Sequence, residues 1–183
     1  MKLFEFVSIS IVVMLSIWIA YGFIFEARVE SPPFDLISKT KQFSIRHYSN
    51  LNLAITHSTS QNSSFRNLFK FIDGENSNDQ KISMTAPVIL DSTHMMFVLP
   101  TSLSSPPTPT NQNVNLKTLQ TLKVAVISFS GYSSQAPKYK QKLQTYLDKA
   151  NILYTSKSFL CQYNSPWVFP MLRKNEVWIE LEK

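Results

Sequence analysis

The sequence predicts an α+β domain made of two similar halves and preceded by one N-terminal transmembrane helix. Strand and helix patterns follow one another in the order strands, helix, strands, and then again in the order strand, helix, strands. Before them lies a long uncharged stretch from Phe6 to Phe25. We therefore assign residues 1–30 to a signal anchor with its linker, and residues 31–183 to one globular domain.

The uncharged stretch from Phe6 to Phe25 is long enough to cross a membrane, because twenty helical residues span about 30 Å. Trp18 and Tyr21 lie towards its end, where aromatic residues meet the membrane interface. The favoured interpretation is an uncleaved single-pass anchor, with the domain on the extracytoplasmic (periplasmic) side. The alternative is a signal peptide that is cleaved near Ala20-Tyr21-Gly22, which would leave a secreted protein.

The first half contains four predicted strands around one helix. Phe43, Ile45 and His47 share one face of an alternating segment, as in a half-buried strand. The predicted strands cover residues 43–48, 51–58, 82–90 and 95–99. Phe65, Leu68, Phe69 and Ile72 have the spacing i, i+3, i+4, i+7, which predicts an amphipathic helix that stops near Gly74 and is capped by Ser63 or Ser64.

The second half follows an ordered loop at residues 100–113 and repeats the pattern. Pro137 suits the first turn of a second helix, and Leu143 and Leu147 belong to its apolar face. The predicted strands cover residues 122–129, 152–163 and 176–181. The two halves share a layout, although they show no evident sequence identity.

The composition excludes several classes of function. The net charge is +6, but no block of Lys and Arg is interleaved with aromatic residues, so we expect no nucleic-acid partner. Cys161 is the single cysteine, which excludes an intrachain disulfide and a cysteine-based zinc cluster. Phosphate-binding, nucleophile-elbow and zinc-protease motifs are absent, and the sequence shows no carboxylate pair suited to acid–base chemistry. We therefore expect no enzyme and no catalytic residues.

Three segments carry a resemblance to a known family: Phe43–Tyr48, Lys81–Val88 and Tyr163–Trp178. They resemble the signature segments of the SOUL haem-binding family, and the resemblance covers roughly Pro33 to Glu182. It implies a distorted antiparallel β-barrel with two packed helices, similar to the effector-binding domains of bacterial regulators. It also implies binding of haem or a related tetrapyrrole in a shallow apolar cleft, for haem carriage, buffering or sensing. The chain resembles a membrane-anchored, bacterial-like member.

The resemblance implies a set of cofactor-binding residues on the first helix and on the loop before the last strand. These residues are Phe65, Leu68, Lys70, Trp167, Phe169, Met171, Arg173 and Lys174. The cations Lys70, Arg173 and Lys174 would contact the haem propionates, or alternatively serve as ordinary surface charges. His47 matches a proposed iron ligand of some members, whereas others lack a histidine there. The competing interpretation is a hydrogen-bonded strand histidine without a ligand role.

Other interpretations stay open at this level. His57 and His94 are weaker candidates for the iron ligand, and a thioether could come from Met84, Met95, Met96 or Met171. The domain could bind another amphipathic small molecule, or a protein partner without haem. The family markers Tyr163, Pro166, Asn175, Glu176 and Trp178 are expected to have structural roles.

Overall fold

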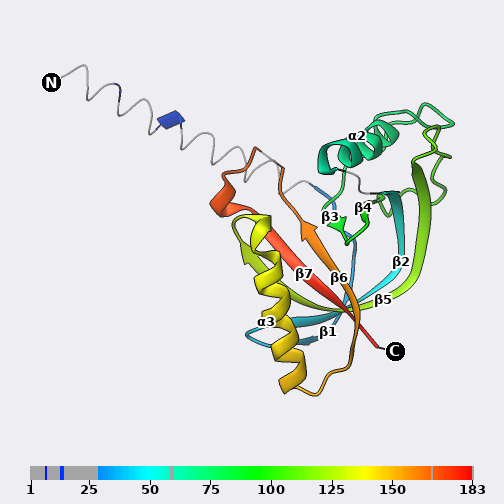
Figure 1. Cartoon of the computed structure of the whole chain (residues 1–183). Helices are drawn as coiled ribbons and strands as arrows, with labels where there is room; N and C mark the ends of the chain where they lie inside the picture. Colours follow the sequence, from blue (N-terminus) through cyan, green and yellow to red (C-terminus); the bar gives the residue numbers. More distant parts are fainter. Residues whose placement is uncertain (1–6, 8–12, 15–28, 58–59, 166, 183) are drawn as a thin grey trace.

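Six antiparallel strands close into a barrel, and two helices pack against its outside (Figure 1). The computed structural model describes residues 7, 13–14, 29–57, 60–165 and 167–182. The strands are β1 (Asp35–Lys39), β2 (Ser44–His57), β3 (Val88–Leu90), β4 (His94–Val98), β5 (Val114–Ser130), β6 (Tyr154–Gln162) and β7 (Lys174–Leu181). The helices are α2 (Gln61–Ile72) and α3 (Ala136–Lys149), with short 3₁₀ turns η1 (Ser133–Gln135) and η2 (Pro170–Leu172).

The strand pairing has the same order in each half of the domain. In the first half β2 pairs with β4 and β4 with β3, and in the second half β5 pairs with β7 and β7 with β6. The β2–β5 and β3–β6 pairs then join the halves and close the ring. Strand β1 lies outside the ring and extends along the first residues of β2. The predicted α+β barrel with two packed helices is therefore confirmed.

Apolar side chains form three clusters. The barrel interior is filled from all six ring strands, with Tyr48 and Trp178 as its largest members. A second cluster lies under α2 and contains Leu68 and Phe71, and a third lies under α3 and contains Leu143. In the described part of the chain, strands β1–β7, helices α2 and α3 and the three clusters all lie within residues 29–182, so this segment has its own hydrophobic core.

Two predicted strands differ from the observed ones for identifiable reasons. The segments 43–48 and 51–58 form one continuous strand, β2, in which Asn50 adopts a φ of 52° and lets the chain bend without ending. The predicted strand 82–90 pairs only over Val88–Leu90. Pro87 has no N–H for a strand ladder, and the Thr85 hydroxyl instead donates to the carbonyl of Val98 at 2.6 Å.

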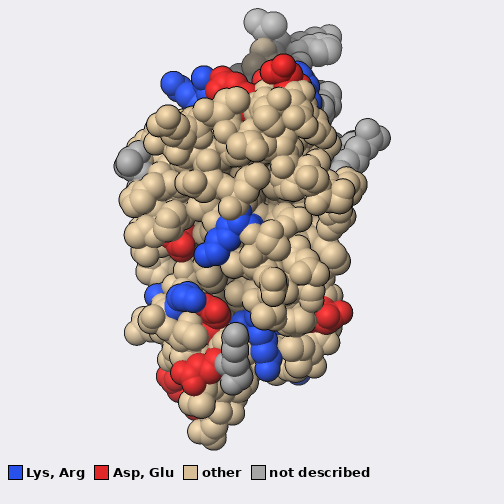
Figure 2. All heavy atoms as spheres, turned by 90° about the vertical axis from the view of Figure 1, so that its right-hand side faces the viewer, with Lys and Arg blue, Asp and Glu red and all other residues tan. Residues whose placement is uncertain are grey.

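The predicted membrane anchor, Phe6–Phe25, lies almost entirely outside the described residues. Within the part of the chain that is described, no helix combines the length and apolar character needed to cross a bilayer. One face of the domain, seen in Figure 2, carries Lys and Arg side chains scattered among acidic ones over a mainly uncharged surface.

Candidate functional site

A cleft of about 590 Å³ separates α2 from the connection between β6 and β7. These are the two segments to which the sequence assigned a ligand site. The cleft is lined by Gln61, Asn62, Phe65, Arg66, Phe69, Val88, Met95, Ser133, Gln162, Asn164, Arg173 and Asn175. Its volume lies within the range of small-molecule sites, about 300–1,000 Å³.

Two phenylalanines of α2 form an aromatic wall of the cleft. Phe65 and Phe69 stack with their ring centroids 6.0 Å apart, and their exposed fractions are 38% and 45%. The edge of Phe65 also contacts the core through Phe97, at 5.3 Å between centroids. Phe65 is thus anchored to the core, Phe69 stacks on it, and both rings are open to solvent, which suits the face of a flat apolar ligand.

Two arginines line the same cleft. Arg66 projects from α2, and Arg173 comes from the residue just before β7. The Nε of Arg173 donates to the carbonyl of Val168 at 2.9 Å, which holds the arginine against its own loop. Guanidinium groups bind carboxylates through paired hydrogen bonds. The cleft therefore combines an aromatic wall with two arginine side chains.

Leu68 and two of the predicted cations do not line the cleft. Leu68 is fully buried beneath α2. Lys70 forms an ion pair with Glu75 at 2.8 Å. Lys174 lies over the ring of Tyr163, with its Nζ 4.0 Å from the centroid.

Three further predicted residues lie on the connection between β6 and β7 but outside the lining. Trp167, Phe169 and Met171 are all exposed, and Trp167 is the most exposed at 79%. Phe169 and Met171 lie on either side of Pro170, the first residue of the 3₁₀ turn η2. Of the predicted cofactor-binding set, the structure brings together Phe65 and Arg173 in the cleft.

His47 lies on β2 and does not line the cleft. Its Nε2 hydrogen-bonds with the hydroxyl of Thr121 at 2.8 Å, and its Nδ1 is 3.5 Å from the carboxylate of Asp35. No histidine occurs among the described residues that line the cleft. Iron ligation by His47 stays a prediction.

Arg66 and Phe69 are cleft residues that sequence reasoning did not assign to the site. Asn62, Phe65, Arg66 and Phe69 have the spacing i, i+3, i+4, i+7 on α2. This spacing defines a second face of the helix, beside the core face that contains Leu68 and Ile72. The same periodicity that predicted the helix could therefore have identified the cleft wall.

A buried polar network lies inside the barrel next to the cleft and is centred on Glu176 of β7. The carboxylate of Glu176 accepts two hydrogen bonds from Arg46, at 3.0 and 3.1 Å. It also accepts from the hydroxyl of Tyr163 at 2.7 Å, from the indole N–H of Trp178 at 2.8 Å and from Ser128 at 3.1 Å. Tyr163, Glu176 and Trp178 are thus joined in one fixed cluster, which we call the Glu176 network.

The Glu176 network shifts the acidity of its members. Burial alone would raise the pKa of Glu176, but the hydrogen bonds from Arg46 and Tyr163 outweigh it, so this pKa lies below its usual value. Burial and then the nearby charge of Glu176 raise the pKa of Tyr163 far above the usual range. Burial likewise raises the pKa of Tyr48 to about 12. The network therefore holds one ionised carboxylate among neutral hydroxyls, paired with Arg46 at 3.0 Å and, at 3.7 Å, with the half-exposed ammonium group of Lys174.

A sequence model of the SOUL heme-binding protein family matches residues 29–180. The chain belongs to the SOUL heme-binding protein family. Its match to heme-binding protein 2 of Homo sapiens has 28% identity over 177 residues, covering 82% of this chain and 85% of the human protein. Its match to heme-binding protein 1 of Xenopus laevis has 26% identity, covering 61% of this chain and 65% of the relative.

Solved structures with the same fold share little sequence identity with this chain. The C-terminal domain of EcmrR matches with a TM-score of 0.59 and 10% identity, over 78% of this chain and 98% of that domain. A hydrolase from Listeria innocua matches with a TM-score of 0.57 and 8% identity, over 80% of this chain and 94% of the other. At such identity, these likenesses establish the fold of the SOUL domain alone.

Proposed function

We propose that this SOUL domain binds haem or a related tetrapyrrole in the cleft between α2 and the β6–β7 connection. The observation that carries the proposal is the stacked, half-exposed pair Phe65 and Phe69 beside Arg66 and Arg173. Family membership supports the ligand class, since relatives of this chain are named heme-binding proteins.

The residues in the cleft fit the two chemical parts of a tetrapyrrole. The macrocycle is flat and apolar, and burying it against Phe65 and Phe69 contributes about 25 cal/mol per Å² of apolar area. The propionates are carboxylates, which Arg66 and Arg173 would hold through charge-assisted hydrogen bonds. Macrocycle burial and propionate contacts then supply the affinity, and the iron needs no side-chain ligand from the described lining. We expect haem and iron-free protoporphyrin to bind alike.

We propose a non-enzymatic role in haem carriage, buffering or sensing at a membrane. The uncharged stretch Phe6–Phe25 supports a single-pass anchor, and the topology that we propose has the domain on the extracytoplasmic, periplasmic side. Cleavage after this stretch would instead release a secreted carrier. Fractionation of cells that express the full chain distinguishes the two, because an anchored protein sediments with membranes and resists extraction by alkali.

Charge reversal in the cleft tests the proposal. The double variant Arg66→Glu/Arg173→Glu should bind haemin at least ten-fold more weakly in an absorbance titration. A matched control, Lys123→Glu/Lys149→Glu, changes the net charge equally at two exposed lysines that do not line the cleft, and should bind as the parent does. Equal affinity of the cleft variant and the parent would overturn the assignment of the propionate contacts.

The aromatic wall is tested separately by Phe65→Ala/Phe69→Ala. Both rings are partly exposed, so their removal should leave the fold intact by circular dichroism while weakening haemin and iron-free protoporphyrin together. Undiminished binding of both ligands by a folded variant would place the tetrapyrrole elsewhere on the domain.

A further inference from the structure

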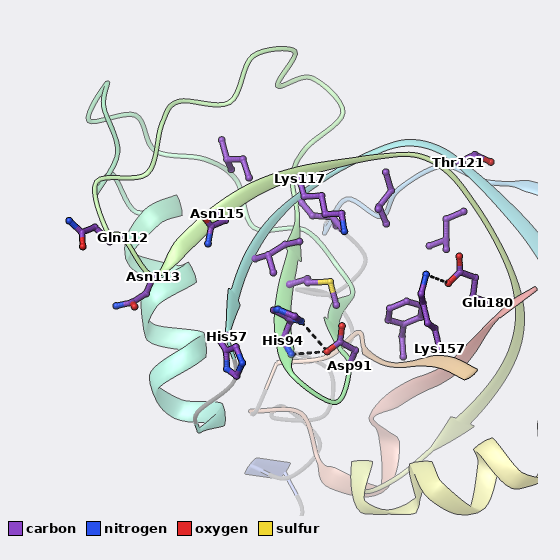
Figure 3. A pocket seen from close by; sticks show the side chains of 17 residues that line it. His57, Asp91, His94, Gln112, Asn113, Asn115, Lys117, Thr121, Lys157 and Glu180 are labelled. Atoms are coloured by element: carbon purple, nitrogen blue, oxygen red, sulfur yellow. Dashed lines mark hydrogen bonds and ion pairs between the residues drawn. The ribbon is translucent and has the colours of Figure 1, made fainter. Parts of the chain in front are cut away.

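A second cavity, of about 650 Å³, opens into the barrel itself at the end remote from the Glu176 network. Its apolar floor consists of interior residues, including Leu53, Met96, Leu122 and Phe159. Its rim is polar, and Figure 3 shows His57 and His94 together on one side, the Lys157–Glu180 ion pair on another, and Lys117 on the strand β5 that arches above them. The tetrapyrrole cleft lies outside the barrel, so the two sites share no lining residue.

The internal repeat explains why this end of the barrel is hollow. Inward side chains follow the same spacing on β2 and β5, where Tyr48, Leu51 and Leu53 correspond to Leu119, Leu122 and Val124. This correspondence makes Lys117 the counterpart of Arg46, because each lies two residues before the first member of its series.

Strand β4 and strand β7 extend the correspondence. Ile55 pairs with Met96 in the first half, and Val126 pairs with Trp178 in the second half, so Met96 is the counterpart of Trp178. His94 becomes the counterpart of Glu176 by the same register. One end of the barrel is therefore filled by Tyr48, Trp178 and the Arg46–Glu176 pair. At the other end the corresponding side chains are the smaller Leu119 and Met96, together with Lys117 and His94, and this end stays open.

The edge of β5 provides the entrance. Residues 44–47 of β2 pair with β1 on one edge and β5 on the other. The corresponding residues of β5, Asn115–Thr118, pair with β2 on one edge, and none of the described strands pairs with their second edge. Their inward side chains are exposed, although they point into a barrel. The cavity is consequently accessible from solvent beside Lys117.

The charges on the rim favour an anionic ligand. Asp91 accepts hydrogen bonds from the backbone N–H groups of Thr93 and His94, both at 2.7 Å, and its carboxylate is 3.4 Å from the ring of His94. Glu180 forms an ion pair with Lys157 at 3.0 Å. Lys117 has no ion pair within the described part of the chain. Asp91 and Glu180 thus already have partners, whereas the charge of Lys117, next to the entrance, has none among the described residues.

We propose that this cavity binds an amphipathic monocarboxylate, such as a medium-chain fatty acid. The ligand carboxylate pairs with Lys117 at the rim, just as the Glu176 carboxylate pairs with Arg46 at the opposite, filled end of the barrel. The alkyl chain lies against Met96, Leu119 and Phe159 on the floor. The proposal stands independently of tetrapyrrole binding, because it rests on a different cavity.

Methyl NMR of methionine separates the two sites in one experiment. Met95 and Met96 are adjacent on β4 and point to opposite faces, so Met95 borders the tetrapyrrole cleft and Met96 borders the barrel cavity. Titration of octanoate into ¹³C-methyl-labelled protein should shift the Met96 signal saturably and leave Met95 in place. The full chain in lipid nanodiscs and the fragment 29–183 in buffer are both used, with empty nanodiscs as the reference for lipid partition. A shift of Met95 alone, or no saturable shift, would overturn the proposal.

Ligand chemistry and variants test the assignment of each part. Octanol should bind at least ten-fold more weakly than octanoate, and each methylene removed from the acid should weaken binding about four-fold. Lys117→Ala should remove the preference for the acid, whereas Lys123→Ala, on the outer face of the same strand, should not. Leu119→Tyr, alone or with Met96→Trp, copies the filled end and should abolish binding. Octanoate affinity that survives in folded Leu119→Tyr protein would refute the cavity as the site.

Discussion

The substitution Glu176→Gln should destabilise the domain strongly, because Glu176 is the only acidic partner of Arg46 in the described structure. The carboxylate is fully buried and the arginine side chain is 14% exposed. Removing one charge of a buried pair costs about 3–5 kcal/mol, since the other charge is left without compensation. The lower end applies here because Arg46 retains some solvent contact and also stacks on Phe34 at 4.5 Å. We expect a loss of about 3 kcal/mol.

Equilibrium urea unfolding of the fragment 29–183, followed by tryptophan fluorescence, measures this loss. For a domain of this size, about 3 kcal/mol corresponds to a fall in Tm of roughly 6–12 °C. The apolar double variant Arg46→Met/Glu176→Leu serves as the control, because it removes both charges and should recover part of the stability. A loss below about 1 kcal/mol for Glu176→Gln would refute the view that this pair organises the barrel interior.

Three further outcomes follow from the described contacts. The pKa of Glu176 is lower in the folded state than in the unfolded state, which stabilises the fold at pH values above the unfolded pKa. Stability should therefore fall as the pH drops through the folded pKa. In urea unfolding at a series of pH values, Glu176→Gln should reduce this fall. The pKa of Tyr48 is raised from about 10 in the unfolded state to about 12 in the folded state, which stabilises the fold at pH values below the unfolded pKa. This contribution should be lost as the pH rises from about 10 to about 12, and Tyr48→Phe should reduce the loss. Asn76→Ala should cost about 1–3 kcal/mol in thermal unfolding, because the buried amide donates to the carbonyls of Phe71 and Gln80 at 3.0 and 2.8 Å; a cost near zero would show that the loop after α2 closes without it.

The sequence predicted the arrangement of most strands and both helices, because their apolar residues recur with the period of a strand or of a helix. The apolar spacing of Phe65, Leu68 and Ile72 specified α2, and alternation specified the strands that bury one face. Strand β5 is an element for which apolar periodicity was not sufficient. Only residues 122–129 were predicted, yet the strand begins at Val114, because Asn115–Thr121 are held by backbone pairing with β2 and line a hollow rather than a core. A strand without a buried face leaves no period to detect.

A cleft lies where the ligand site was predicted, but only part of the predicted residue set lines it. The resemblance placed a ligand between the first helix and the last connection, and Phe65 and Arg173 do line the cleft there. Lys70 and Lys174 have partners of their own, which depend on contacts that spacing cannot supply. The pairing of Arg46 with Glu176 joins residues 130 positions apart, so it could only be seen in the folded chain.

Tetrapyrrole binding at the cleft is tested by a parallel absorbance titration of the fragment 29–183 with haemin and with iron-free protoporphyrin. We expect saturable 1:1 binding of both ligands with affinities within about three-fold, because the cleft would hold the macrocycle and its propionates rather than the iron. Failure of both ligands to saturate would contradict tetrapyrrole binding at this cleft. Binding of haemin alone would show that the iron has a side-chain ligand, and His47→Ala would then be the variant that identifies it.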